Sequence, residues 1–80
     1  MTSIARDLRM SPQARKVLAH LEQFGTISPL EAFGVFGITR LAARIKEIRD
    51  AGHIVNTTMH KDASGKPYGR YTLVAIAKAA

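Results

Sequence analysis

The chain has 80 residues and a mass of 8.7 kDa, which is enough for one small domain with one modest core. Hydrophobic residues make up 46% of it, which excludes a disordered tail, and the absence of cysteine excludes both a disulfide framework and a thiolate zinc site. The formal net charge of +6 points to a polyanionic partner, because Lys and Arg side chains that neutralise phosphates release condensed counterions.

The start of the chain carries no targeting signal that we recognise. It lacks the uninterrupted apolar stretch of a secretory signal, and no apolar run approaches the roughly 18 residues needed to span a bilayer. We therefore expect a cytoplasmic protein without a membrane partner. Residues 1–10 show no clear period and carry Arg6 and Arg9, so we interpret them as a basic N-terminal arm that precedes one domain over residues 11–80.

The first helix is predicted from about Pro12 to Phe24. Ser11 suits the N-cap, and proline suits the first helical position, where a missing N–H costs nothing. Gly25 can adopt the left-handed conformation that ends a helix. Apolar residues at three- and four-residue steps predict one stripe facing the core. The stripe consists of Ala14, Val17, Leu18, Leu21 and Phe24.

A second, short helix is expected over about Pro29 to Val35. Residues 26–27 before it are predicted to be a short extended link. Ser28 and Glu31 have the spacing of a capping box, in which each side chain satisfies the other residue's amide. Residues 34–37 contain two glycines, which should end this helix after about two turns.

A third helix is expected to open at Ile38 and Thr39 and to end at Gly52. Its predicted inner stripe consists of Leu41, Ile45 and Ile48. This helix is longer than the second and basic, and a tight glycine-containing turn separates the two. That arrangement is typical of a helix-turn-helix unit.

The pattern changes to extended chain after Gly52. Residues 53–60 are rich in β-branched side chains and predict a strand, and residues 70–74 predict its partner. Between them, residues 61–69 contain the glycine, proline and serine of a long hairpin loop. The predicted fold class is therefore α+β, with three helices followed by a two-stranded antiparallel hairpin.

This order of elements resembles the winged helix-turn-helix fold over about residues 11–74, with the hairpin as the wing. Four stretches also resemble a group of small helix-turn-helix proteins found often in phages and prophages. They are residues 11–13, 37–45, 51–53 and 65–71. The resemblance implies binding of double-stranded DNA by a phage or prophage-type transcriptional regulator or a DNA-recombination accessory factor. It implies a nucleoid-associated location in a bacterial or phage-infected cell, and neither catalytic residues nor a cofactor.

In the resembled fold the third helix enters the major groove, where each base pair presents its own pattern of donors and acceptors. A step of about 100° per residue turns one set of side chains outward and places Arg44 on the flank of the inner stripe. The expected contacts are Thr39, Arg40, Ala43, Arg44, Lys46 and Glu47. A small side chain at Ala43 permits close approach, and the guanidinium forks suit guanine or phosphate. The alternative is an amphipathic surface helix whose charges only face water.

The hairpin would lie over the minor groove or the phosphate backbone. Its expected contacts are Lys61, Ser64, Lys66, Tyr68 and Arg70, and the arm could add Arg6 and Arg9. Tyr71 is expected to pack in the core instead. The alternative is a mobile, solvated loop without a ligand.

No catalytic or metal site is predicted, and we expect no enzyme activity. His20, His53 and His60 lie on separate predicted elements without metal-ligand spacing. Glu22 and Asp62, the carboxylates nearest to them, form no pair typical of general acid and base catalysis.

The carboxyl-terminal segment, residues 73–77, would offer apolar side chains to both faces of a continued strand. It could join two chains as a homodimer on a pseudo-palindromic site, or carry a helix that folds back on the first helix. The alternative function is a protein-interaction module that binds a host or phage protein. It would use this segment or a surface containing Phe33 and Phe36.

Overall fold

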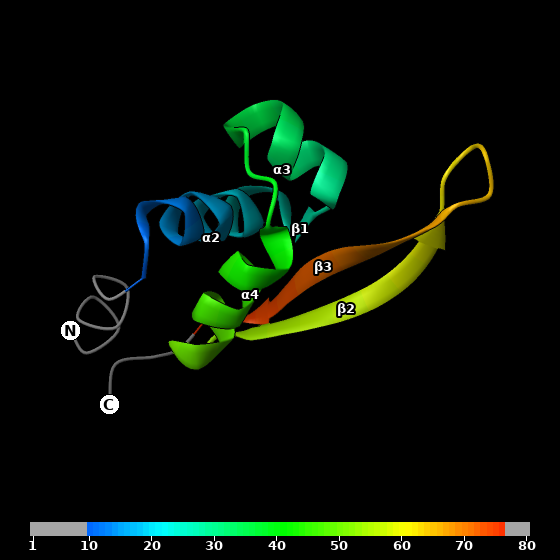
Figure 1. Cartoon of the computed structure of the whole chain (residues 1–80). Helices are drawn as coiled ribbons and strands as arrows, with labels where there is room; N and C mark the ends of the chain where they lie inside the picture. Colours follow the sequence, from blue (N-terminus) through cyan, green and yellow to red (C-terminus); the bar gives the residue numbers. More distant parts are fainter. Residues whose placement is uncertain (1–9, 77–80) are drawn as a thin grey trace.

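The computed structural model describes residues 10–76 (Figure 1). It contains the helices α2 (Pro12–Phe24), α3 (Pro29–Phe36) and α4 (Leu41–Asp50), and the strands β1 (Thr26–Ile27), β2 (Ile54–Lys61) and β3 (Pro67–Ala75). The predicted α+β class is confirmed. The expected arm, with Arg6 and Arg9, lies outside the described residues except for Met10, which is 5% exposed and belongs to the core. Residue 77 of the predicted apolar segment also lies outside them.

Helix α2 begins and ends at the predicted signals. The Ser11 side chain accepts a hydrogen bond from the Ala14 N–H, and Gly25 adopts φ 86° while its N–H bonds to the Leu21 carbonyl. The first four members of the predicted stripe are buried, but Phe24 is 63% exposed, so its assignment to the core was wrong. Phe24 is the last residue of the helix, and its ring packs on His20 at the surface, 4.7 Å between centroids.

Helix α3 carries the complete capping box. The Ser28 N–H donates to Glu31 Oε1 at 2.9 Å, and the Glu31 N–H donates to Ser28 Oγ at 3.2 Å. Gly37 ends the helix in the left-handed conformation, with φ 69°. The helix is one residue longer than predicted, because Phe36 stays helical and packs against the core.

Helix α4 begins at Leu41, two to three residues after the predicted start. The Ile38 N–H bonds back to the Ala32 carbonyl of α3 at 3.2 Å, and the Ile38 side chain is buried. Ile38 therefore closes the previous helix instead of opening the next one, and Arg40 stands at the N-cap of α4 with φ −117° and ψ 62°. The predicted inner stripe is confirmed, since Leu41, Ile45 and Ile48 are all buried.

Within residues 10–76 the sheet has three strands in the order β1-β3-β2, one more than predicted. The residues predicted as an extended link form β1, which pairs antiparallel with β3 so that Ile27 lies opposite Tyr71. Ile27 is completely buried, and Tyr71 packs against the core as predicted. The hairpin loop is shorter than predicted, because Lys61 and Pro67 still pair as strand residues and only residues 62–66 connect the strands.

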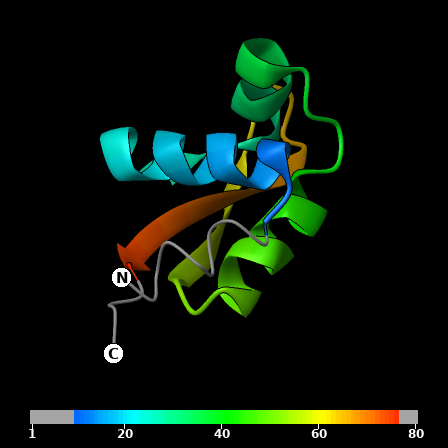
Figure 2. The same ribbon diagram turned by 90° about the vertical axis from the view of Figure 1, so that its left-hand side faces the viewer.

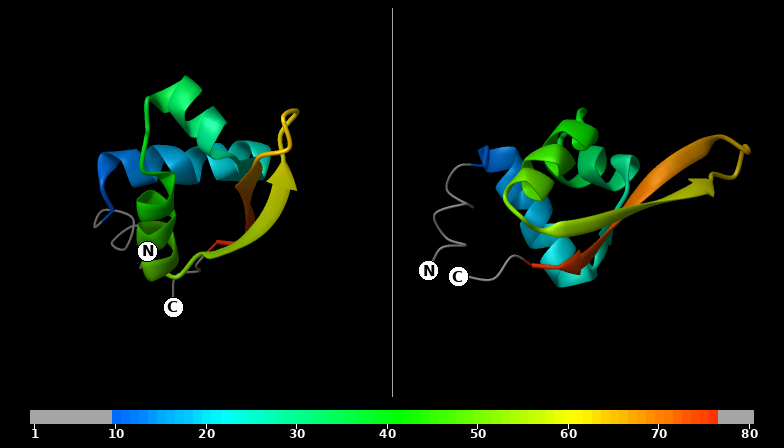
Figure 3. Two further views of the ribbon diagram at one scale, coloured as in Figure 1. Left: turned by 45° about the vertical axis from the view of Figure 1, so that its right-hand side comes forward. Right: turned by 90° about the horizontal axis from the view of Figure 1, so that it is seen from below.

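The helices form one end of the molecule and the hairpin the other. Figure 2 shows α2 crossing between α3 above and α4 below, and Figure 3 shows the β2–β3 hairpin extending away from these helices. In β2 only Val55 is buried, so the hairpin is attached at its base and exposed beyond it. The longest described helix has 13 residues, and none is long and apolar enough to cross a lipid bilayer.

Candidate DNA interface

The side of α4 opposite its buried stripe carries the first group of expected contacts. Lys46 is exposed on this side and Ala43 is half-buried, and Thr39 and Arg40 are exposed just before the helix begins. Within the described residues the Arg40 side chain has no hydrogen bond or ion pair. Lys46 Nζ lies 2.8 Å from Asp50 Oδ2, and this hydrogen bond raises the pKa of Lys46. Because both side chains are exposed, the pair holds Lys46 only weakly and leaves it available to another anion.

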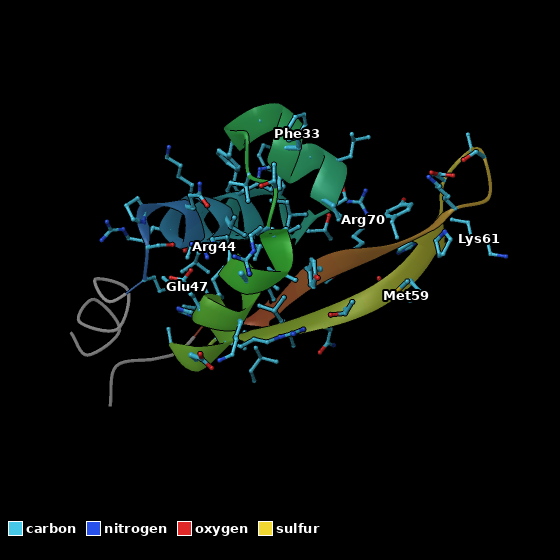
Figure 4. The ribbon with its side chains drawn as sticks, viewed as in Figure 1. Phe33, Arg44, Glu47, Met59, Lys61 and Arg70 are labelled. Carbon is cyan, nitrogen blue, oxygen red and sulfur yellow. The ribbon has the colours of Figure 1, made fainter. Side chains whose placement is uncertain are left out.

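Arg44 and Glu47 lie on the flank of α4 that faces the start of α2 (Figure 4). Glu47 Oε1 accepts from the Ser11 N–H at 2.8 Å, and Oε2 accepts from the Ser11 hydroxyl at 3.1 Å. Arg44 Nη1 lies 2.9 Å from Glu47 Oε2 and also donates to Ser11 Oγ. The prediction that Glu47 points outward was wrong, because the N-cap of α2 covers this flank and binds the carboxylate.

The environment of Glu47 favours its charged form. The hydrogen bond from the Ser11 backbone lowers its pKa, and the Ser11 hydroxyl and the Arg44 charge act in the same direction against a partial desolvation. The neighbouring Arg44 guanidinium is only partly satisfied, since its Nε is buried and has no hydrogen-bond partner. Arg44 and Glu47 together connect the middle of α4 to Ser11, the residue before α2.

Arg49 is a residue of this region that the sequence analysis missed. From the last turn of α4 its Nε and Nη2 both donate to the Val55 carbonyl, at 3.1 and 2.7 Å, and Nη2 also donates to Thr57 Oγ1 at 3.0 Å. Its guanidinium carbon lies 6.0 Å from the centre of the Tyr71 ring. The available signal was a basic residue in the last helical turn close before a strand, but that position alone specifies no partner.

The hairpin tip, residues 62–66, contains the exposed Lys66, and the exposed Lys61 lies directly before it. Asp62 Oδ1 organises the tip by accepting from the Ser64 N–H, the Ser64 hydroxyl and the Lys66 N–H, at 2.7 to 2.9 Å. These bonds, with the Ser64 hydroxyl first, lower the pKa of Asp62. Ser64, an expected DNA contact, therefore donates its hydroxyl hydrogen within the protein.

Arg70 and Tyr68, the other expected hairpin contacts, also have partners inside the protein. Arg70 Nη1 donates to Thr26 Oγ1 at 2.9 Å and lies 3.2 Å from Glu31 Oε1, which connects β3 to the start of α3. Partial burial opposes the charge of Glu31, but the Ser28 N–H and the charge of Arg70 more than compensate, so its pKa is lowered. Tyr68 stacks on His60 across the hairpin, 5.7 Å between centroids.

We expect Asp62→Ala to loosen the hairpin tip without unfolding the domain. The substitution removes the single acceptor shared by three donors in residues 64–66, so their amides should open more often. Hydrogen exchange followed by NMR should show several-fold faster exchange at Ser64 and Lys66 and unchanged exchange at Leu21. Equal rates in both proteins at the tip would contradict this role.

Exposed apolar side chains gather on α3 and along the C-terminal end of β3. Leu30 and Phe33 are 80% and 58% exposed, and they line a groove of about 570 Å³ between α3 and the hairpin, together with Tyr68. At the C-terminal end of β3, Val74 is 56% exposed, and Ile76, just after the strand, is 44% exposed. Among the described residues no group of three or more His, Asp or Glu side chains is placed to hold a metal ion.

Comparison with known proteins agrees with this architecture. A family model described as a winged helix-turn-helix domain matches residues 12–76, which include every described helix and strand. Neither the curated proteins nor the solved structures gave a match. The match covers well over half of the chain. The chain therefore belongs to the winged helix-turn-helix domain family, whose fold is a DNA-binding fold.

Proposed function

We propose that the protein binds double-stranded DNA sequence-selectively, with α4 in the major groove and the hairpin against the backbone or the minor groove. One observation carries the proposal. Arg40, Lys61 and Lys66 are exposed, and their side chains have no partner within the described residues. They can therefore bind phosphate or guanine without breaking a native contact, and the net charge of +6 favours approach to DNA.

The proposed contacts fall into two groups. Those that break no buried contact are Thr39, Arg40, Ala43 and Lys46 on the α4 side, where Lys46 gives up only its exposed pair with Asp50, and Lys61 and Lys66 on the hairpin. Those that would first exchange an internal partner are Arg44, Glu47, Ser64, Tyr68 and Arg70. We propose that the first group supplies the binding, and the second stays a prediction.

The biological setting is proposed from the resemblance stated above. It favours a phage or prophage regulator of transcription, or an accessory factor in DNA recombination. A homodimer through the exposed Val74 and Ile76 would suit a two-fold symmetric site. The symmetry of the bound DNA tests this part of the proposal directly.

Selection from random duplex DNA at a fixed salt concentration tests the function. The expected result is enrichment of one motif, and a palindromic motif would indicate a dimer. Enriched and random duplexes bound equally well would contradict sequence-selective binding.

Lys66→Ala should weaken binding to all sequences alike and reduce the slope of log affinity against log salt by about one. The reason is the loss of one phosphate contact that carries no sequence information. Titrations at several salt concentrations measure it. Lys16→Ala is the matched control. It removes the same charge, but Lys16 lies on the surface formed by α2 and α3, away from the hairpin. Equal slopes for wild type and Lys66→Ala would contradict the hairpin contact.

A protein-interaction role is the second candidate, and the exposure of Leu30 and Phe33 beside a groove favours it. Phe36, predicted for the same surface, packs against the core instead. Pull-down from host lysate with and without nuclease separates the two functions. A stoichiometric partner that survives nuclease and is lost in Phe33→Ala would support this candidate, and a partner lost with the DNA would contradict it.

A further inference from the structure

We infer that Arg49 is a positioning residue that holds the hairpin at a fixed angle to α4, so that both can contact one duplex. This inference rests on the proposed function. From the last turn of α4, the Arg49 guanidinium donates hydrogen bonds to the Val55 carbonyl and the Thr57 hydroxyl of β2. A guanidinium fork that grips one carbonyl with two N–H groups restrains orientation as well as distance.

The base of the hairpin is the place where such a restraint matters. Val55 is the only buried residue of β2, and the residues from Asn56 to Lys61 are exposed. On β3, Arg70 makes a second connection through Thr26 and Glu31, but that connection leads to α3 and β1. The side-chain hydrogen bonds of Arg49 join α4 directly to β2 of the hairpin.

The geometry of the strand amplifies any change at the base. Lys61 lies six residues beyond Val55 and four beyond Thr57, so at about 3.3 Å per residue it stands about 20 Å from the Val55 carbonyl and about 13 Å from Thr57. A small rotation at the base therefore moves the tip by several ångströms. Lys61 and Lys66 would then lose their register with the phosphates while α4 stays in place.

The first test measures the hairpin angle without DNA. Because the chain has no cysteine, spin labels at Lys16→Cys on α2 and Ala63→Cys at the tip report a single distance distribution. We expect Arg49→Ala and Arg49→Lys to broaden that distribution, because lysine keeps the charge but loses the fork. Thr57→Val, which removes one of the three bonds, should broaden it less. Distributions equal to wild type in both Arg49 variants would overturn the inference.

The second test links the angle to binding through a double-mutant cycle. Arg49→Ala should weaken binding about fivefold, and Lys66→Ala should then have much less effect on affinity and salt slope than it has in wild type. An equal effect of Lys66→Ala in both backgrounds would overturn the positioning role. The positioning role would also be overturned if Arg49→Lys bound DNA as tightly as wild type and Lys66→Ala had its full effect in that variant. The positive charge alone would then account for the contribution of Arg49 to binding.

The two tests separate this inference from the proposed function. If Lys66→Ala changes nothing in wild type, the hairpin contact of the proposed function fails, and the label distances still decide whether Arg49 sets the angle. Thermal unfolding of each variant serves as the folding control. A variant that unfolds cooperatively near the wild-type temperature and shows the broadened distribution supports the inference.

Discussion

Replacing Arg40 by alanine should weaken binding to a selected duplex by about 1–3 kcal/mol, or roughly 5- to 150-fold, with little change in stability. Stability should stay nearly unchanged because the Arg40 side chain makes no capping bond at the N-cap of α4 and has no other partner within the described residues. Its removal therefore costs the free protein almost nothing. Fluorescence anisotropy with the enriched duplex measures the affinity, and urea unfolding measures the stability.

Arg40→Lys determines what Arg40 contacts. Lysine keeps the positive charge and loses the planar fork that suits guanine. Near wild-type affinity in Arg40→Lys would indicate a phosphate contact, and a loss comparable to that of alanine, with relaxed preference at one base pair, would indicate a base contact. Lys16→Ala again serves as the control for charge. If Arg40→Ala binds the enriched duplex as well as wild type does, α4 is not docked as proposed.

The helix boundaries could be predicted where the signal lies within a few residues. Ser11 caps the residue three positions later, Ser28 and Glu31 bond each other, and Gly25 ends its own helix. Each of these residues acts on backbone groups within four positions of itself, so the helix end does not depend on how the rest of the chain packs. The start of α4 was misplaced because a tertiary burial decided it, namely the side chain of Ile38 against the core.

The candidate site was less predictable, because it depends on which elements lie side by side. A helical period shows which residues oppose the buried stripe, but it does not show that another helix covers the flank. Glu47 therefore resembled a solvent-facing residue, although it bonds Ser11, 36 positions away. Arg70 and Thr26 are likewise 44 positions apart, and β1 is recognisable as a strand only once β3 lies beside it.

Glu47→Ala should lower the free energy of unfolding by about 1–3 kcal/mol at neutral pH, because it leaves two donors of Ser11 without their acceptor and removes the anionic partner of Arg44. The side chains of Arg44 and Glu47 are 23% and 28% exposed, so water replaces the lost bonds only in part. Glu22→Ala is the matched control. Glu22 is an exposed carboxylate on α2, and its removal should change stability by less than about 0.5 kcal/mol.

The difference between wild type and Glu47→Ala should depend on pH. Because the folded protein lowers the pKa of Glu47, the stabilisation by its charge is fully present above the unfolded value of about 4.3 and is lost as pH falls through the lower folded value. Urea unfolding of both proteins between neutral pH and about pH 3 measures this, and comparing the pair cancels the other carboxylates. A constant difference over that range would show that packing of the side chain, and not its charge, connects α4 to the N-cap of α2.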